Sequence, residues 1–263
     1  MIRELTVPWF LDRPRLGLAT GPDDVVSVPD RQRHSVAAIP SEGSTAEAVA
    51  PIHREIAAFV AEAVRDDDLP LVIAGDCCAA IPVAAGLQRA GVRAELVWLD
   101  AHGDFNTPAT SPSGFLGGMP LAMLTGRGDL AMLDALGATP LADERVRLGD
   151  ARDLDAAEGD TLSASGVQVA SRLDALLATL AEGAVVHLHF DCDVVTRSEV
   201  PAQSYPVDGG PGVAEVETFL AALAARTTIA AISVCAWDPS LDEDGRSARL
   251  CRRCIDAACG PAP

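Results

Sequence analysis

Two apolar segments of the chain, 96–99 and 185–190, are each followed by acidic residues at alternate positions. Residues two apart in an extended chain point the same way, so each group presents its side chains together. Four carboxylates held close would repel one another and take up protons unless cations lay between them. We therefore predict a metal centre built from Asp100, His102, Asp104, Asp191 and Asp193.

The number and kind of these ligands indicate which metal would bind. One divalent ion would neutralise only half of the charge on the four carboxylates, whereas two ions would balance it, and shared carboxylates bridge two ions naturally. Oxygen ligands with one imidazole suit Mn²⁺ better than a zinc site, which prefers thiolates. A single Asp-x-Asp is more often a turn or helix-cap feature, but two such groups after two apolar segments are much rarer.

A third apolar segment, 71–74, leads into Gly75, Asp76 and Cys77. In open α/β sheets ligands bind beyond the carboxyl ends of the strands, so the residues that follow each apolar segment matter most. Cys77 is therefore a further candidate metal ligand. Its alternative role is that of a small apolar core residue, because free cysteine is commonly buried.

The chain alternates between short apolar segments and longer segments rich in Ala and Leu. The apolar segments lack polar alternation, which is typical of parallel strands buried on both faces. We expect strands at 71–75, 94–100, 145–148, 184–190 and 229–237. We expect helices at 44–65, 79–90, 169–182 and 213–226. This order predicts one α/β domain over residues 1–263, with a mostly parallel sheet and helices on both faces.

The composition excludes several chemistries and partners. Of 263 residues, 38 are acidic and 20 basic, giving a net charge of −18, and every basic residue is arginine. Without lysine there is no Schiff-base, pyridoxal-phosphate or Walker-type phosphate chemistry. The acidity argues against nucleic acid and anionic membranes as partners, and no apolar run approaches the roughly 20 residues of a membrane span. Seven cysteines, with no signal-peptide pattern, indicate a reducing cytoplasm.

Three motifs follow one another in a fixed order. They are Gly75-Asp76, then WLDAHGDFNTP at 98–108 with Ser113-Gly114 and Gly118-Met119-Pro120, then HLHFDCD at 187–193 with Val200-Pro201-Ala202. In order and spacing they resemble the arginase/agmatinase/formiminoglutamase family, the ureohydrolases. The resemblance implies a single α/β domain with a centre of two Mn²⁺ ions. It also implies that a metal-bridging hydroxide attacks a guanidinium carbon and releases a urea.

The resemblance implies roles for individual metal ligands. Asp100 and Asp191 would bridge or support the ion pair. His102 and Asp193 would bind one ion. Asp104 would bind the other ion and would also orient the hydroxide, which makes it the catalytic residue.

A substrate site is implied in the same way. Asn106, Ser111 and Ser113 fall where arginases hold a substrate carboxylate. Asp153 falls, with an offset of one residue, near the acid that meets the α-amino group of the substrate.

Three positions depart from the family pattern. Cys77 stands where the family has a metal-binding histidine, Gly117 where it has a histidine thought to shuttle protons, and Ala236 where it has a glutamate that grips the guanidinium. A thiolate can bind a metal, but it is a soft donor, and Mn²⁺ prefers harder ones. The first metal would then bind more weakly, or a different metal would be used.

Two interpretations follow from these departures. In the first, the chain is a ureohydrolase-type hydrolase of linear amidines with an altered small-molecule substrate. A hydroxyguanidine such as N-hydroxy-L-arginine can bind neutral and needs no glutamate, and hydrolysis would give hydroxyurea and ornithine. In the second, the chain is a non-catalytic metal-binding or regulatory homologue. Retention of the other ligands favours the hydrolase, and analogy with the family predicts a homo-oligomer.

The remaining histidines and cysteines receive structural roles. His187 and His189 share one face of a strand, so we expect hydrogen bonds in the core. His34 and His53 are expected to be solvated, in a helix or loop. The C-terminal thiols, Cys251, Cys254 and Cys259, are expected to be buried or surface residues, because a zinc site needs four ligands and no second Cys-x-x-Cys follows.

Overall fold

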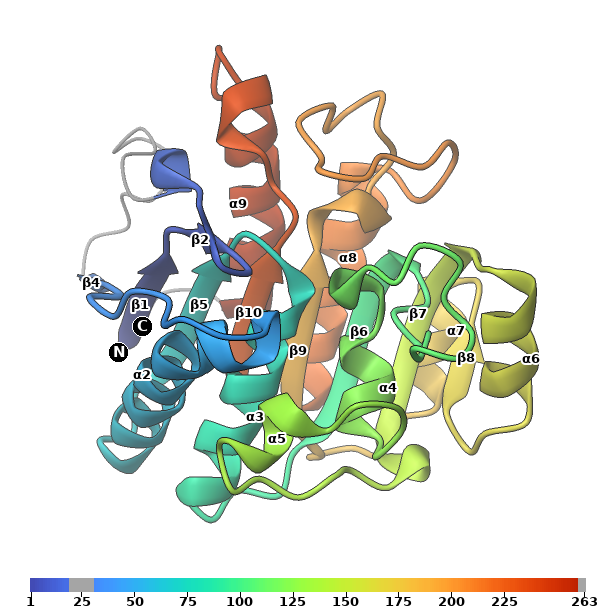
Figure 1. Cartoon of the computed structure of the whole chain (residues 1–263). Coiled ribbons are helices and arrows are strands. Elements are labelled where there is room, and N and C mark those ends of the chain that lie inside the picture. The colour runs from blue at the N-terminus through green and yellow to red at the C-terminus, as the bar shows by residue number, and fades with distance from the viewer. Residues whose placement is uncertain (19–30, 260–263) are drawn as a thin grey trace.

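The computed structural model describes residues 1–18 and 31–259, and its central layer is an eight-stranded sheet (Figure 1). In sheet order the strands are β4 (Arg31–Ser35), β1 (Ile2–Val7), β5 (Leu69–Ala74), β10 (Thr228–Cys235), β9 (Val185–Asp191), β6 (Glu95–His102), β7 (Val146–Asp153) and β8 (Gln168–Ala170). All neighbouring pairs in this sheet are parallel. An antiparallel hairpin, β2 (Trp9–Phe10) with β3 (Arg13–Pro14), follows β1. The prediction of a parallel sheet is confirmed.

Helices cover both faces of the sheet, as predicted. In Figure 1 the helices α2, α3, α4 and α5 lie in front of the sheet, and α8 and α9 lie behind it. The helices are α2 (Thr45–Arg65), α3 (Ala80–Arg89), α4 (Pro120–Leu124), α5 (Ala131–Asp134), α6 (Ala156–Ser163), α7 (Leu173–Ala178), α8 (Val213–Arg226) and α9 (Arg246–Cys259). Within residues 1–18 and 31–259, no helix has the length and apolar character needed to cross a membrane.

The central strands form where the sequence is apolar on both faces. Leu71, Leu96, Leu99 and Ile232 have no solvent exposure, because helices cover the sheet on both sides. Helix α2 begins at the predicted capping box, in which the side chain and backbone of Ser44 are both engaged by Glu47.

The chain reverses its direction of travel across the sheet between two neighbouring strands. From β6 the chain continues to β7, and from β9 it continues to β10, which lies on the opposite side. The connections therefore diverge, and they leave a crevice beyond the carboxyl ends of β6 and β9. Ligands of open α/β sheets bind at such a switch point.

Several elements differ from the sequence prediction. The expected helix 169–182 is instead the edge strand β8, which pairs with β7, followed by the short helix α7. The expected strand 145–148 continues to Asp153. No pattern in the sequence predicted β1, β4, α6 or α9, because their segments carry charges that hide the apolar periodicity.

The expectation for two histidines also needs correction. His53 is not solvated: it lies on the inner face of α2, is 5% exposed, and burial lowers its pKa to about 4. His34 is exposed, but it lies on strand β4 rather than in a helix or loop. The spacing of apolar residues along α2 places His53 on the buried face of the helix. The polar character of histidine, taken alone, had suggested a solvated position.

We predict that His53 makes the protein less stable as the pH falls. The folded pKa of about 4 lies below the ordinary value of about 6.5, so between these values the unfolded chain binds more protons. The stability is present above pH 6.5 or so and is lost as the pH falls, by about 2 kcal/mol at about pH 5. His53→Gln should lose this share of the pH dependence in urea unfolding, whereas the exposed-site control His34→Gln should keep it. Equal slopes for wild type and His53→Gln would contradict the prediction.

Candidate functional site

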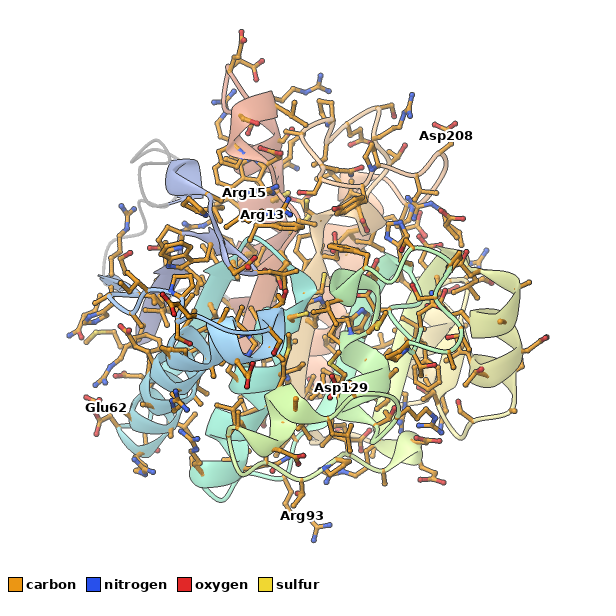
Figure 2. All side chains as sticks on the ribbon, in the orientation of Figure 1. Arg13, Arg15, Glu62, Arg93, Asp129 and Asp208 are labelled. Atoms are coloured by element: carbon orange, nitrogen blue, oxygen red, sulfur yellow. The ribbon has the colours of Figure 1, made fainter. Side chains whose placement is uncertain are left out.

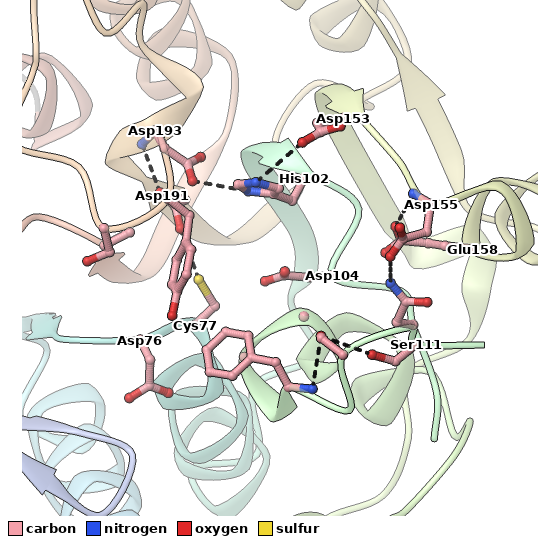
Figure 3. A pocket seen from close by; sticks show the side chains of 18 of the residues that line it. Asp76, Cys77, His102, Asp104, Ser111, Asp153, Asp155, Glu158, Asp191 and Asp193 are labelled. Atoms are coloured by element: carbon pink, nitrogen blue, oxygen red, sulfur yellow. Dashed lines mark hydrogen bonds and ion pairs between the residues drawn. The ribbon is translucent and has the colours of Figure 1, made fainter. Parts of the chain in front are cut away.

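The floor of the candidate site is formed where β6 and β9 end side by side (Figure 3). Asp100 is 1% exposed, and its carboxylate accepts hydrogen bonds from Trp98 Nε1 at 3.0 Å and from the backbone N–H of His102 at 2.7 Å. Irregular pairing of β6 with β7 after Asp100 lets the strand turn outward at His102. The end of β6 thus places one carboxylate beneath the pocket and one imidazole in its wall.

The end of β9 contributes two further carboxylates and links them to β6. The backbone N–H of Asp193 donates to Asp191 Oδ1 at 2.8 Å. Asp193 in turn accepts from the backbone N–H of Ala101 at 3.1 Å, and its other oxygen lies 3.1 Å from His102 Nδ1. Both carboxylates are almost completely buried. These bonds fix the two strand ends relative to each other.

Asp104 lies in the same site, but its side chain is oriented by a left-handed backbone conformation and not by the strand. Its backbone is in the left-handed region, with φ 48°, so the alternation of an extended strand does not continue to this residue. Its carbonyl oxygen accepts from the backbone N–H of Leu121 at 3.0 Å, at the start of α4. Its Oδ2 is buried and has no hydrogen-bond partner within the described residues. The predicted residue is in the site, but the predicted reason for its orientation was wrong.

The cluster carries more negative charge than its surroundings balance. No arginine lines the pocket in the part of the chain that the structure describes. Burial, and then the nearby carboxylates, raise the pKa of Asp104 and of Asp191 well above the usual range. Although burial opposes it, hydrogen bonds to Asp100 and Asp193 raise the pKa of His102 to about 12. The arrangement therefore favours a bound cation.

Cys77 lies in a short 3₁₀ turn, Cys77–Ala79, that follows β5. Asp76 caps this turn by accepting from the backbone N–H of Cys78 at 3.0 Å, and Gly75 allows the close approach of Trp9, whose carbonyl oxygen lies 2.5 Å from the place of a Cβ. Cys77 Sγ is consequently 3.0 Å from Asp191 Oδ2. A hydrogen bond with the Cys235 thiol, together with burial, raises the pKa of the Cys77 thiol well above its usual value.

Candidate ligand atoms form three groups, each within 4.8 Å. These are Asp100 with His102 and Asp193, Asp100 with Cys77 and Asp104, and Cys77 with His189 and Cys235. Asp191 belongs to none of these groups, but its Oδ2 lies 3.0 Å from Cys77 Sγ, which belongs to the second and third. The structure thus brings together all six residues that the sequence singled out as metal ligands, and it adds two that the sequence analysis did not.

The residues expected to bind substrate line the pocket above this floor. The hydroxyls of Ser111 and Ser113 lie 3.5 Å apart and accept backbone N–H groups of the same loop. Asn106 donates through Nδ2 to Asp155 at 3.0 Å, while its Oδ1 is buried with no partner among the described residues. Asp153 is at the rim, with a side chain 63% exposed and 4.0 Å from His102 Nε2.

Two acidic residues in the pocket wall were not predicted from the sequence. Asp155 and Glu158 form a capping box at the start of α6, and Glu158 also accepts from the backbone N–H of Phe105 at 2.8 Å. This bond anchors the loop after β6. The capping-box spacing of these two residues was a signal that the sequence carried.

Aromatic residues from distant parts of the chain form the mouth of the pocket. The rings of Phe10 and Phe115 stack with centroids 6.0 Å apart, and Tyr205 lies 5.3 Å from Phe115. Phe115 also occupies the space beside Gly117, where an added Cβ would be 2.3 Å from its ring. No sequence spacing links these three residues, so only the fold reveals them.

The two histidines of β9 form the expected core hydrogen bonds. His187 Nε2 and His189 Nδ1 both lie 2.9 Å from the hydroxyl of Ser233 on β10. Burial lowers the pKa of each imidazole to about 3, so both are neutral. The expectation of core hydrogen bonding is confirmed.

A protein-family model described as the Arginase family matches residues 11–260. The chain belongs to the arginase family. The arginase of Bacillus caldovelox is 33% identical to it over 217 residues, which are 78% of this chain and 73% of the relative. The native structure of that arginase at pH 5.6 superposes with a TM-score of 0.86 at 28% identity, over 99% and 98% of the two chains. The arginase of Bacillus cereus gives the same TM-score and identity over 100% and 99%.

Membership of the arginase family confirms the predicted fold and the predicted enzyme class. Members of this family hydrolyse non-peptide carbon–nitrogen bonds of linear amidines, so this arginase-family chain is a hydrolase of that class.

We predict that Asp193→Asn binds less metal than the wild type. Asp193 shares one group of ligand atoms with Asp100 and His102, and an amide there removes a negative charge without changing the shape. After loading with Mn²⁺ and desalting, elemental analysis should show at least one ion fewer per chain in the variant.

The matched control is Asp208→Asn, at an aspartate of a surface loop whose side chain is 88% exposed (Figure 2). It should keep the metal content of the wild type. Equal metal content in Asp193→Asn and wild type would contradict the assignment of Asp193.

Proposed function

We propose that this arginase-family hydrolase acts on a guanidino substrate with two bound Mn²⁺ ions, and that N-hydroxy-L-arginine is converted to hydroxyurea and ornithine. The observation that supports this most strongly is the group of four buried carboxylates on the floor of a pocket whose wall offers hydroxyl and amide groups. The chemistry would take place in a reducing cytoplasm, and by analogy with the family the chain would form a homo-oligomer.

The residues present fit a cation at one position well. Asp100, His102 and Asp193 offer hard oxygen and imidazole donors, which suit Mn²⁺. A second ion would lie near Asp104 and Asp191, because Asp104 Oδ2 is buried with no hydrogen-bond partner among the described residues and could bind it. When bound, the ions would activate a water molecule as nucleophile and neutralise developing charge. Cys77 fits Mn²⁺ poorly at this second position.

Asp104 is the proposed catalytic residue. Its Oδ2 is buried with no hydrogen-bond partner among the described residues, and the left-handed backbone holds the carboxylate at the centre of the pocket (Figure 3), where it would orient the attacking water.

The pocket wall is suited to the amino-acid end of a substrate. Ser111, Ser113 and the amide of Asn106 offer donors for a carboxylate. Asp153 at the rim and Asp155 beside Asn106 offer negative charge for an α-amino group.

The pocket has no acid at position 236, where the resemblance to the family places a glutamate that grips the guanidinium. Ala236 contributes only a methyl group, and Phe115 fills the place beside Gly117. A hydroxyguanidine is less basic than a guanidine, so it can bind in the neutral form. This difference favours N-hydroxy-L-arginine over L-arginine.

We predict that the Mn²⁺-loaded protein hydrolyses N-hydroxy-L-arginine and hydrolyses L-arginine poorly or not at all. Hydroxyurea, urea and ornithine should be measured side by side. Ala236→Glu adds the missing counter-charge at the pocket wall, so it should shift the ratio of kcat/KM values toward L-arginine. The conservative control Ala236→Ser should leave the ratio close to that of the wild type.

Two outcomes would contradict parts of this proposal. Equal or better turnover of L-arginine by the wild type would exclude the altered substrate. No turnover of either compound by protein with both ions bound would favour another amidine, or the non-catalytic metal-binding role.

A further inference from the structure

Two soft thiol side chains and one imidazole meet behind the carboxylate cluster. Cys77 follows β5, Cys235 ends β10 and His189 lies on β9, and these three strands are consecutive in the sheet. Their ligand atoms lie within 4.8 Å of one another, and none of the three residues is more than 8% exposed. The sheet therefore places two thiols and an imidazole around one buried point.

Among the ligand atoms of this group, His189 Nε2 has no hydrogen-bond partner within the described residues. Cys77 Sγ bonds to Asp191 Oδ2, and Cys235 Sγ bonds to the carbonyl oxygen of Asp76, each at 3.0 Å. His189 uses Nδ1 for Ser233, so its Nε2 is buried with no hydrogen-bond partner in the described ranges. A buried polar atom without a partner costs about 1–3 kcal/mol, so a ligand at this place would recover that cost.

The imidazole is also held in a fixed plane. The indole of Trp98 stacks on the ring of His189 with centroids 3.6 Å apart. With Nδ1 bonded to a neighbouring hydroxyl and the ring clamped by an aromatic face, Nε2 is oriented as metal-binding histidines are oriented by their outer-shell partners.

We propose that Cys77, Cys235 and His189, with Asp191 as a fourth ligand, bind a thiophilic divalent ion of the Zn²⁺ type. This ion would take the place of the second Mn²⁺, next to the position formed by Asp100, His102 and Asp193. The inference therefore revises the second ion of the proposed function and rests on that function for the neighbouring Mn²⁺. The centre would hold one hard and one soft metal position.

The geometry and the donor chemistry support this ion. Tetrahedral zinc with bonds of about 2.3 Å to sulfur places two sulfur atoms about 3.8 Å apart, within the 4.8 Å limit of this group. Thiolate and imidazole donors select zinc-type ions over Mn²⁺. Binding would release the two thiol protons to solvent, because a coordinated thiol is deprotonated.

Cobalt spectroscopy tests the site without relying on turnover. Metal-free full-length protein, kept reduced, is titrated with Co²⁺, which reports thiolate ligands by a charge-transfer band in the near ultraviolet. We expect the band in the wild type and loss of about half its intensity in Cys235→Ser, because one of the two thiolates that can bind is removed. Zn²⁺ added in equal amount should abolish the band, whereas Mn²⁺ should not.

Matched variants separate this site from its neighbours. Cys78→Ser changes the adjacent buried thiol, which bonds instead to the carbonyl oxygen of Leu116, and it should keep the full band. Asp193→Asn should also keep the band, because Asp193 belongs to the hard position. Since even outer-shell partners are worth roughly 10–100-fold in metal affinity, Cys235→Ser should weaken Zn²⁺ binding at least about tenfold.

Three results would overturn the inference. They are absence of the band in the wild type, an undiminished band in folded Cys235→Ser, or a Cys77–Cys235 disulfide that persists when the metal-free protein is treated with a reductant. Because the band is read without substrate, lack of turnover with the band present would count against the proposed function and leave the soft site standing. Turnover without the band would count against the soft site alone.

Discussion

Unbalanced negative charge at the ends of two neighbouring strands is the constraint on which the rest of this structure depends. Asp100, Asp104, Asp191 and Asp193 are all at most 5% exposed, and no arginine of the described chain lines their pocket. Water cannot screen the charges at this depth, so protons or cations must balance them. The parallel sheet, the capped 3₁₀ turn after β5 and the left-handed backbone at Asp104 all serve to hold this repulsive arrangement together.

The features that could be predicted from the sequence are the apolar strand segments and the acidic residues that follow them. The apolar run before Asp100, and the run before Asp191 that only two histidines interrupt, identify buried parallel strands. Parallel strands must end at the same edge of the sheet. The meeting of these two groups therefore follows from topology alone. Motif order extended the prediction to Asn106, Ser111 and Ser113, which all line the pocket in the structure.

Features produced by long-range packing could not be predicted in this way. Phe115 fills the space beside Gly117 because its own loop folds back. The sequence shows that position 117 has no side chain, but it does not show which residue fills the space. The apolar residues around Cys235 and His189 indicated core strands. The sequence did not show that these two strands lie next to the strand that leads to Cys77, so the cluster was not predicted. The missed strands, β4 at the edge of the sheet and β1 next to it, carry charged residues, so no apolar pattern marks them.

The convergence of β5, β6, β9 and β10 on one point has a consequence for the lifetime of the protein in a cell. A cation at this point binds the folded chain but not the unfolded one, so it stabilises the fold by mass action. At a free cation concentration 100 times the dissociation constant, the stabilisation is about 2.7 kcal/mol. A chain starved of metal would open more often and be degraded by proteases sooner. The abundance of this protein would then follow the metal supply of its host.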